Sequence, residues 1–416
     1  MPEFLHLLPP REALTLLLES LPHQTESEEV ESRAALARVT FSPVVARYPL
    51  PSFPRSTVDG YAVRAADTHG AGESLPAYLQ LVGEVPMGAS PDFELSPAEC
   101  AIIHTGGMLP ANADAVVMIE HTQRARPAEV EVLRSVAAGE NILKVGEDVA
   151  EGQEVIPAGT RLRPAEIGGL MALGITHLQV ARRPRIAILS TGDEVVPPEQ
   201  EIGPGQVRDV NSYTLSALVE KAGGEPVRYG IISDQAGDLL AAASRALREC
   251  DTLVITAGSS ASVRDLTSQV INQLGPPGVL VHGVDVRPGK PTILAVCKVQ
   301  QSHRLKPVIG LPGNPVSALV IAGLFVVPVV EAQLGVKRLR PRPLVQARLI
   351  LNLASQAGRE DWVPVRLLPA EGGYEAEPIF GKSNLIFTLA RADGLLRIPP
   401  DATGLSAGEL VEVVLF

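Results

Sequence analysis

The sequence predicts a multidomain protein of α/β and β type. Its central parallel α/β domain is accompanied by a β-rich inserted domain, a discontinuous N-terminal helical domain and a C-terminal β-barrel. The chain of 416 residues exceeds the size of about 250–300 residues at which one hydrophobic core stops growing. Apolar strands alternate with amphipathic helices between residues 183 and 335. Outside this stretch, short apolar segments separated by Gly and Pro are typical of β domains.

Changes in pattern along the chain give the domain boundaries. The predicted N-terminal domain comprises residues 1–50 and 145–182, and the β-rich domain, 51–144, is inserted between these two segments. The α/β domain follows at 183–335, and the barrel at 336–416. Helical periodicity predicts helices at 11–21, 26–39 and 165–173 in the N-terminal domain. The basic, Pro-rich run at 336–343 is typical of a linker.

Composition and charge argue against several classes of partner and location. The net charge is −11 with scattered basic residues, which argues against nucleic acid as the main partner. Three widely spaced cysteines without a CxxC pattern indicate neither a disulfide framework nor a thiolate zinc site, and favour a cytoplasmic location. The most apolar run, 316–330, is shorter than a membrane span and contains Pro328. We therefore expect no membrane partner, and a buried helix that ends at this proline.

The stretch 251–265, DTLVITAGSSASVRD, carries the first indication of a site. A short apolar strand enters a Gly/Ser loop, and an amphipathic helix follows. Ser262 and Asp265 have the spacing of a capping box at the start of this helix. The exposed N–H groups of such a loop, at the positive end of a helix dipole, suit an anion. An ordinary βα turn in which Asp265 only caps the helix is the alternative.

Acidic residues follow three strands of the predicted sheet. Glu194, Asp234 and Asp265 each lie just past a strand end. Ligands of parallel α/β sheets bind beyond the carboxyl ends of the strands, so we expect the three carboxylates at one edge. They could bind a divalent cation, transfer protons or activate water. Helix capping is the alternative, and it explains Glu194 poorly.

Two further segments add positive charge to the same edge. Arg287 and Lys290 flank a Pro-Gly turn, which suits an oxyanion or phosphate, although a solvated surface pair is the usual alternative. In the segment LPGNP, Asn314 fits an N-cap and Pro315 the first helical position. Carboxylates, cations and two helix dipoles together predict a site for a metal-assisted, phosphate-bearing ligand.

Two segments of the β-rich domain are ambiguous by themselves. Asp59-Gly60 is a strong turn signal, so Asp59 is most simply a hairpin residue. Thr105 stands in a Thr-Gly-Gly loop between two predicted strands, which is more often a turn than a site.

Taken in order, the segments resemble one family, the molybdopterin molybdotransferases (MoeA and the E domain of gephyrin). The resemblance covers nearly the whole chain and rests on PLPSFPRSTVDGYAV, HTGGMLPANADAVVMIE, NILKVGED, RRPRIAILSTGDEVV, VRPGKP, GLPGNPVSA, GKSNLIFTLARADGLL and LSAGELVEVVLF. It implies an elongated homodimer with four domains per chain, the third of which binds molybdopterin. It also implies a transferase that catalyses the last step of molybdenum cofactor synthesis. Molybdate is inserted into adenylylated molybdopterin, and AMP is released with Mg²⁺ present.

The resemblance also implies roles for individual residues. Glu194, Asp234 and Asp265 would bind the metal at the nucleotide end and act in catalysis. Asp59, as a catalytic residue, and Thr105 would help to form the site across the dimer. The implied substrate-binding residues in the α/β domain are Gly258, Ser260, Arg287, Lys290, Pro312, Gly313, Asn314 and Ser317. Arg359 and Ser383 in the last domain would line the same cleft, and the molybdopterin adenylyltransferase is a possible partner.

Several positions depart from the family pattern. Ala257 and Ser262 replace two glycines of SGGxSxGxxD, and a Cβ costs roughly 1 kcal/mol where φ must be positive. Leu143 replaces an arginine, and Arg287 replaces the first lysine of KPGKP. These departures leave open a catalytically weakened carrier or scaffold, or a tungstate-inserting variant. A generic nucleotide-binding α/β enzyme lacks support, because the chain has no P-loop lysine motif and no GxGxxG.

Overall fold

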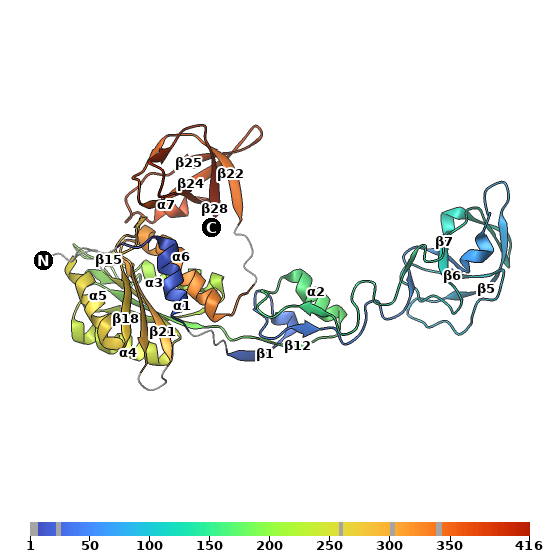
Figure 1. Cartoon of the computed structure of the whole chain (residues 1–416), viewed down its shortest axis with the longest axis horizontal. Helices are drawn as coiled ribbons and strands as arrows, with labels where there is room; N and C mark the ends of the chain where they lie inside the picture. Colours follow the sequence, from blue (N-terminus) through green and yellow to red (C-terminus); the bar gives the residue numbers. More distant parts are fainter. Residues whose placement is uncertain (1–6, 22–25, 258–260, 300–303, 338–342) are drawn as a thin grey trace.

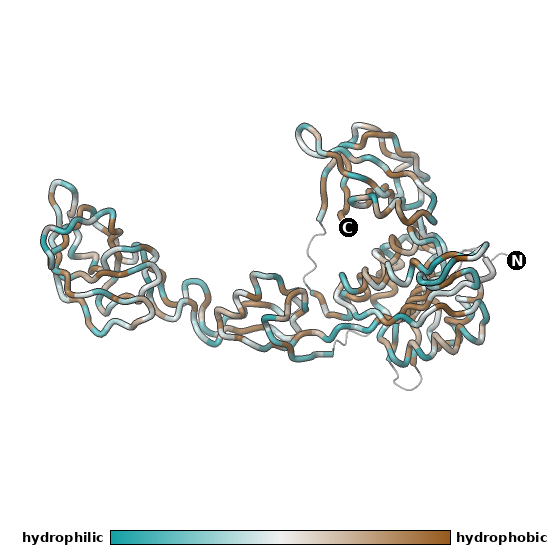
Figure 2. Tube along the Cα trace, turned by 180° about the vertical axis from the view of Figure 1, so that it is seen from behind, coloured by the Kyte–Doolittle hydropathy of each residue, from teal (hydrophilic) through white to brown (hydrophobic). Residues whose placement is uncertain are grey.

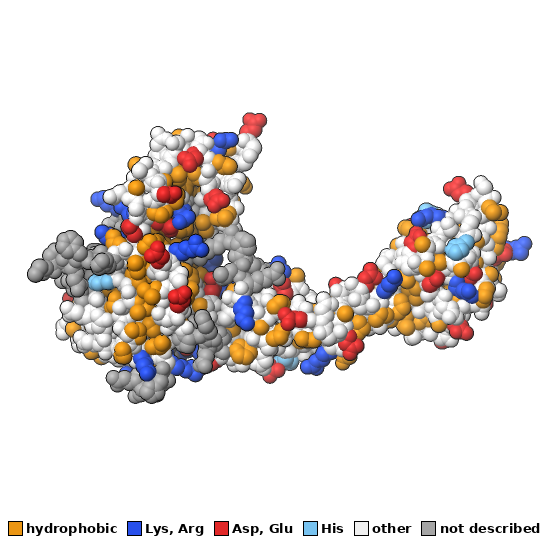
Figure 3. Space-filling view, viewed as in Figure 1, with side chains coloured by type: hydrophobic (Ala, Val, Ile, Leu, Met, Phe, Trp, Pro, Cys, Tyr) orange, Lys and Arg blue, Asp and Glu red, His pale blue; other side chains and the backbone are white. Residues whose placement is uncertain are grey.

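The computed structural model describes residues 7–21, 26–257, 261–299, 304–337 and 343–416. The protein is elongated. The α/β unit and the C-terminal barrel lie together at one end, the β-rich unit lies at the other, and a narrow middle unit joins them (Figure 1). The space-filling view shows the same narrow section between two broader ends (Figure 3). Residues at opposite ends therefore cannot meet within one chain unless the middle unit bends strongly.

The α/β unit is built on a six-stranded sheet in the order β16-β13-β17-β21-β20-β18. These strands are β13 (Arg185–Thr191), β16 (Glu225–Ile232), β17 (Thr252–Ala257), β18 (Pro277–His282), β20 (Ile293–Lys298) and β21 (Leu305–Pro312). The first four strands in the sheet order are parallel, as predicted, whereas β20 and β18 are antiparallel. No crossover helix connects β18 to β20 or β20 to β21, and a parallel pairing needs one.

Helices cover both faces of this sheet. They are α1 (Pro10–Glu19), α3 (Asn211–Ala222), α4 (Ala236–Glu249), α5 (Ala261–Leu274) and α6 (Pro315–Gln333). Helices α1, α3 and α6 bury apolar side chains on one face, and α4 and α5 on the other. The sheet strands between them are largely hydrophobic (Figure 2). Residues 1–50 were assigned to the N-terminal domain, but α1 joins the α/β unit instead, because α6 covers its apolar face.

Helix α6 corrects the prediction that the helix ends at Pro328. The helix continues through this proline to Gln333. Buried Phe325, Val329 and Val330 on both sides of the proline pack into the core, and this packing outweighs the one backbone hydrogen bond that proline removes. By length and composition alone, α6 is also the one described helix that could cross a membrane, and more than half of its apolar window is buried. It forms the core beneath the candidate site.

One other local prediction is wrong. The predicted helix at 26–39 is strand β1 (Ser27–Glu31) followed by one 3₁₀ turn. Pairing of β1 with β12 (His177–Ala181), 150 residues later by number, outweighs the local helical pattern. Helix α3 begins at Asn211, and the Asp209 Oδ1 accepts a hydrogen bond from the Ser212 N–H at 3.1 Å.

Two separated chain segments form the middle unit and carry the β-rich unit. In the middle unit, β1 pairs with β12, β2 (Val44–Val45) pairs with β11 (Glu154–Ile156), and α2 (Pro164–Ala172) packs beside them. The pair β3 (Arg55–Ser56) and β10 (Ile142–Leu143) closes the base of the insertion. The insertion is a sheet in the order β7-β4-β6-β5-β9-β8, with β4 (Gly60–Val63), β5 (Ala77–Val85), β6 (Glu99–Ile103), β7 (Ala115–Met118), β8 (Thr122–Arg126) and β9 (Glu129–Val132).

The C-terminal unit is a closed five-stranded barrel. Its ring runs β24-β25-β22-β28-β26 and closes through β24–β26. The strands are β22 (Leu344–Leu349), β24 (Glu360–Ala370), β25 (Gly373–Pro378), β26 (Gly394–Ile398) and β28 (Leu410–Leu415), with a short helix α7 (Phe387–Ala390). Strand β19 (Val286–Arg287) leaves the α/β unit and pairs with β24 in parallel. The barrel is thereby attached beside the start of α6.

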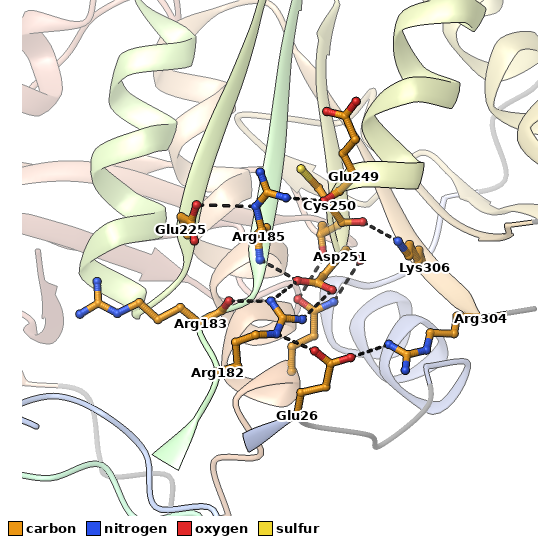
Figure 4. Close-up of polar contacts among 12 residues, drawn as sticks. Glu26, Arg182, Arg183, Arg185, Glu225, Glu249, Cys250, Asp251, Arg304 and Lys306 are labelled. Atoms are coloured by element: carbon orange, nitrogen blue, oxygen red, sulfur yellow. Dashed lines mark hydrogen bonds and ion pairs between the residues drawn. The ribbon is translucent and has the colours of Figure 1, made fainter. Parts of the chain in front are cut away.

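A hinge cluster of charged side chains joins the middle unit to the α/β sheet (Figure 4). It consists of Glu26, Arg182, Asp251 and Arg304. Arg182 donates two hydrogen bonds to the Asp251 carboxylate, at 3.0 and 3.1 Å. Arg182 and Arg304 also donate to Glu26, at 2.7 and 2.8 Å. The hydrogen bonds to Asp251 are the main reason why the pKa of Arg182 is raised, so this side chain stays charged. The cluster fixes the direction in which the middle unit leaves the sheet.

We expect Asp251→Ala to lower the free energy of unfolding by about 1–3 kcal/mol, because Arg182 and the Arg185 N–H lose their acceptor. Urea unfolding, followed by circular dichroism, measures the free energy of unfolding. Small-angle X-ray scattering shows whether the distance distribution of the variant is broader than that of the wild-type protein. Glu225→Gln is the matched control, because its ion pair with Arg185 is exposed and 3.6 Å long. Equal stability of the two variants would contradict a structural role for the cluster.

Candidate functional site

A cleft of about 1070 Å³ lies between the α/β unit and the C-terminal barrel. The turn after β19, the start of α6, strand β24 and the loop after β25 line it. The predicted substrate-binding residues that it brings together are Arg287, Lys290, Pro312, Asn314, Ser317, Arg359 and Ser383. Gly313 lies between two of them, and its carbonyl accepts a hydrogen bond from the Asn211 side chain at 2.8 Å. Residues from two domains therefore converge on one cavity.

The charge of the cleft is positive. Its lining contains four cationic side chains and one carboxylate: Arg287, Lys290, Arg359, Lys382 and Asp361. Asp361 is buried and accepts both hydrogen bonds of the Arg359 guanidinium, at 2.7 and 3.1 Å. Arg287 is exposed and lies 3.8 Å from the same carboxylate. Because one carboxylate is set against four cations, the lining keeps an excess of positive charge that suits an anion.

The start of α6 forms one wall of the cleft. Asn314 is the N-cap and Pro315 the first helical residue, as predicted, but the Asn314 side chain makes no capping hydrogen bond. It donates to the Ser383 Oγ at 3.0 Å, and the Ser383 carbonyl accepts from the Val316 N–H at 3.0 Å. Ser383 of the C-terminal unit thus takes the place of a cap. The positive end of a 19-residue helix is directed at the cavity.

Gly289 allows the cationic turn to lie against this helix. Its φ is +116°, and an added Cβ would lie 2.2 Å from Ile321 Cγ1 in α6. Any larger residue would push the turn away from α6, and with it the adjacent Lys290.

Acidic residues gather at a second part of the same sheet edge. Glu194 is exposed after β13, and Asp234 is half-buried after β16. Partial burial, followed by the charges of Asp193 and Glu194, raises the pKa of Asp234. The Asp234 Oδ1 is buried and receives no hydrogen bond from the residues that the structure describes. Asp234 does not cap α4, whose N-cap is Gln235. A carboxylate oxygen left unsatisfied among other carboxylates fits a cation such as Mg²⁺ in ligand type.

The other predicted residues of this sheet edge follow β17 in the sequence. Gly258 and Ser260 lie outside the described residues, as do the side chains of Ser262 and Asp265. Among the side chains that the structure does describe, no three acidic, His or Cys residues form a metal-binding group. Ala257 is placed: it ends β17 opposite Pro312 without a positive φ, so alanine in place of the family's glycine causes no backbone strain there.

One buried carboxylate at this edge was missed by sequence reasoning. Asp209 accepts hydrogen bonds from the Ser190 and Ser212 hydroxyls, at 3.0 and 2.5 Å. It joins β13 to the start of α3. The spacing of Asp209 and Ser212, three residues apart before a helical pattern, is the signal that could have identified it.

Asp59 and Thr105 lie together next to β4 and β6 in the β-rich unit. Figure 1 shows this unit at the opposite end of the molecule from the α/β unit and the barrel, which together form the cleft. The Thr105 N–H and hydroxyl donate to Asp59 Oδ1 at 2.8 and 3.2 Å. The hydrogen bond from the Thr105 N–H chiefly lowers the pKa of Asp59, so this carboxylate is ionised. The hairpin interpretation is wrong: Gly60 begins β4 between two strands, and an added Cβ would lie 1.9 Å from the Val117 carbonyl oxygen. Leu143 pairs with Arg55 at the base of the same unit.

Comparison with known proteins covers the whole chain. Family profiles match in order: the MoeA N-terminal region (domains I and II) at 8–174, the probable molybdopterin binding domain at 187–332, and the MoeA C-terminal region (domain IV) at 346–416. A molybdopterin molybdenumtransferase of a Nostoc species is 34% identical, over 96% of this chain and 91% of its own. The same-named protein of Bacillus subtilis is 31% identical, over 94% and 90%.

The fold comparison agrees with the sequence comparison. The crystal structure of a molybdopterin biosynthesis MoeA protein from Pyrococcus horikoshii superposes with a TM-score of 0.86 at 33% identity. It covers 99% of this chain and 100% of that one. The predicted fold class is confirmed.

We expect Asp234→Asn to raise the midpoint of thermal unfolding by about 1–3 °C at pH 8. The folded-state pKa of Asp234 is raised above its ordinary value of 3.8, so its contribution to stability is present at low pH and is lost as the pH rises through the folded-state pKa. The rise in the unfolding midpoint of Asp234→Asn over wild type should therefore be smaller at pH 4 than at pH 8. Calorimetry at both pH values checks this, with Asp238→Asn as the nearby control. A gain that is equal at both pH values would contradict it.

Proposed function

This chain belongs to the MoeA family of molybdopterin molybdenumtransferases, and from that premise we propose that it inserts molybdate into adenylylated molybdopterin with release of AMP. This reaction would be the last step of molybdenum cofactor biosynthesis. The observation that carries the proposal is the cleft of about 1070 Å³ with four cations and one carboxylate at the start of α6. Both substrates are anions, and the cavity has room for more than a single oxyanion.

In this proposal the cationic side of the cleft binds molybdate. Arg359 is held by two hydrogen bonds to Asp361, so its remaining N–H groups are oriented before the anion arrives, and Arg287 lies 3.8 Å from the same carboxylate. Lys290 makes no ion pair with any described residue and can neutralise the anion directly. A prearranged set of donors loses little conformational entropy on binding, which favours a small, doubly charged oxyanion.

The acidic edge would hold the nucleotide end of the ligand. We propose that Glu194, Asp234 and Asp265 bind Mg²⁺ there, and the unsatisfied Asp234 oxygen supports this assignment. Bound Mg²⁺ would neutralise the phosphates and polarise the phosphoryl group that is cleaved. Strand β17 lies between β13 and β21 in the sheet order, so one extended ligand could span the acidic edge and the cleft.

A homodimer is part of the proposal. The ionised Asp59, anchored by Thr105, lies at the far end from the cleft of its own chain, so it would act on the cleft of a second copy. We also propose that the protein is cytoplasmic, because its three buried cysteines are free thiols. Contact with the molybdopterin adenylyltransferase, which would supply the adenylylated substrate, completes the proposal.

Lys290→Ala should reduce molybdate-dependent AMP release by about 10- to 100-fold, because one of the anion's charge partners is lost. AMP release from adenylylated molybdopterin with Mg²⁺ is measured by chromatography. The chain's only tryptophan, Trp362, lines the cleft and reports molybdate binding by its fluorescence. Lys221→Ala, at the last turn of α3, is the control.

The same assay separates the alternatives. Tight ligand binding by the wild-type protein without AMP release would indicate a carrier, and faster turnover with tungstate would indicate a tungstate-inserting variant. Full activity of Lys290→Ala would contradict the assignment of the cleft.

Mixing two inactive variants tests the two-copy site. Asp59→Asn and Lys290→Ala homodimers should each be impaired, whereas an equal mixture after subunit exchange should recover about a quarter of wild-type activity, because half of the dimers are mixed and each has one intact site. Activity is measured before and after exchange, with unmixed variants as controls. An absence of recovery in verified mixed dimers would show that Asp59 does not act across the dimer.

A further inference from the structure

Three titratable side chains form a row at one edge of the β-rich sheet. Asp59 precedes β4, His104 follows β6, and Glu84 is near the end of β5. Strands β4, β6 and β5 are neighbours in the sheet, and their register places Gly60 opposite Ile103 and Glu84 opposite Ile102. The row is therefore built by strand pairing, and not by the chance orientation of mobile side chains.

The imidazole of His104 lies between the two carboxylates. Its Nε2 is 2.9 Å from Glu84 Oε1, which is a hydrogen-bond distance. Its Nδ1 is 3.9 Å from Asp59 Oδ1, the oxygen that Thr105 also contacts. The ring is thus held on one side and faces Asp59 on the other. The second oxygen of Asp59 receives no hydrogen bond from the part of the chain that the structure describes, so it is available to a ligand.

A small cavity of about 320 Å³ opens beside this row. Its polar lining comes from Asp59, Tyr61, His104, Thr122 and Arg124. Arg124 Nε donates to the Tyr61 hydroxyl at 3.4 Å. The side chains of Asp59, His104 and Glu84 are 64, 42 and 54% exposed, so a second molecule can reach the row directly. Its surroundings contain two carboxylates, one guanidinium and one phenol.

We propose that His104 is a positioning residue of the Asp59 centre: Glu84 holds the ring through Nε2, and the ring presents a charged Nδ1–H to Asp59. This inference rests on the proposed function of Asp59. With Nε2–H donated to Glu84, Nδ1 carries a proton only when the ring is positively charged. The charged N–H fixes Asp59 Oδ1 together with Thr105, and directs the other oxygen outward to the substrate.

The sign of the pH dependence follows from this geometry. The Nδ1–H exists only on the charged ring, so its contact with Asp59 is lost when a rise in pH removes the proton. The groups that face the ring are Asp59, Glu84 and Arg124 with Tyr61. The advantage of the wild-type protein over a variant without the imidazole should therefore fall as the pH rises.

Two amide variants distinguish the ring nitrogens. His104→Gln keeps an N–H near the Nε2 position and places nothing near Nδ1, whereas His104→Asn keeps a neutral N–H near Nδ1. We expect His104→Gln to lower kcat for AMP release about 10-fold at pH 6 with the KM for molybdate within about 2-fold. The ratio to wild type should rise toward 1 as the pH is raised. His104→Asn should retain more activity than His104→Gln and show no such pH dependence.

Two further measurements complete the test. Glu84→Gln should reproduce part of the loss, and in the Asp59→Asn background His104→Gln should have no additional effect. In NMR of the protein labelled with ¹⁵N-histidine, Asp59→Asn should shift the Nδ1 resonance of His104 at pH 6, which requires no activity. Wild-type activity in His104→Gln at pH 6, or an unchanged Nδ1 resonance, would overturn the inference. No AMP release by the wild-type protein, with the NMR shift present, would instead overturn the proposed function.

Discussion

Strand β19 leaves the α/β unit and pairs with β24 of the C-terminal barrel, so that Arg287 lies opposite Asp361. The cleft depends on this contact. The pairing brings the two guanidinium groups of Arg287 and Arg359 to one buried carboxylate, and Ser383 adds hydrogen bonds to the start of α6. Without the pairing, each domain would carry isolated surface cations, and exposed cations separated by a Debye length are largely screened. Joined, they form one anion-binding cavity.

The two kinds of charge are separated along one sheet edge. Cations gather beyond β21 beside the barrel, and carboxylates gather beyond β13 and β16. Burial first, and then the charges of Asp193 and Glu194, raise the pKa of Asp234, and a divalent cation would offset both effects. An anion at one end and a cation at the other would hold a phosphate-bearing ligand in one orientation. The polarity of the edge, more than any single residue, favours the proposed reaction.

The length of the molecule is also part of the argument. The middle unit holds the β-rich unit away from the cleft, and the hinge cluster around Arg182 and Asp251 sets its direction (Figure 4). A mobile arm would lose conformational entropy each time it docked on a second copy, whereas a fixed arm does not. The row of Asp59, His104 and Glu84 is then presented at the far end as a preformed surface.

The sequence by itself determined the fold class, the alternation of strands and helices in the α/β unit, and the positions of Arg287, Lys290 and Asn314 at strand and helix ends, because these follow from local pattern. Arg359 and Ser383 were indicated only by the family resemblance, and Asp361 and Lys382 were not predicted. The sequence could not show that Pro328 lies inside α6, that residues 27–31 form a strand, or that α1 covers α6, since these depend on contacts between distant segments. Only the tertiary structure separated Asp59 from Lys290 and placed His104 between two carboxylates, because strand register and domain spacing decide which side chains meet.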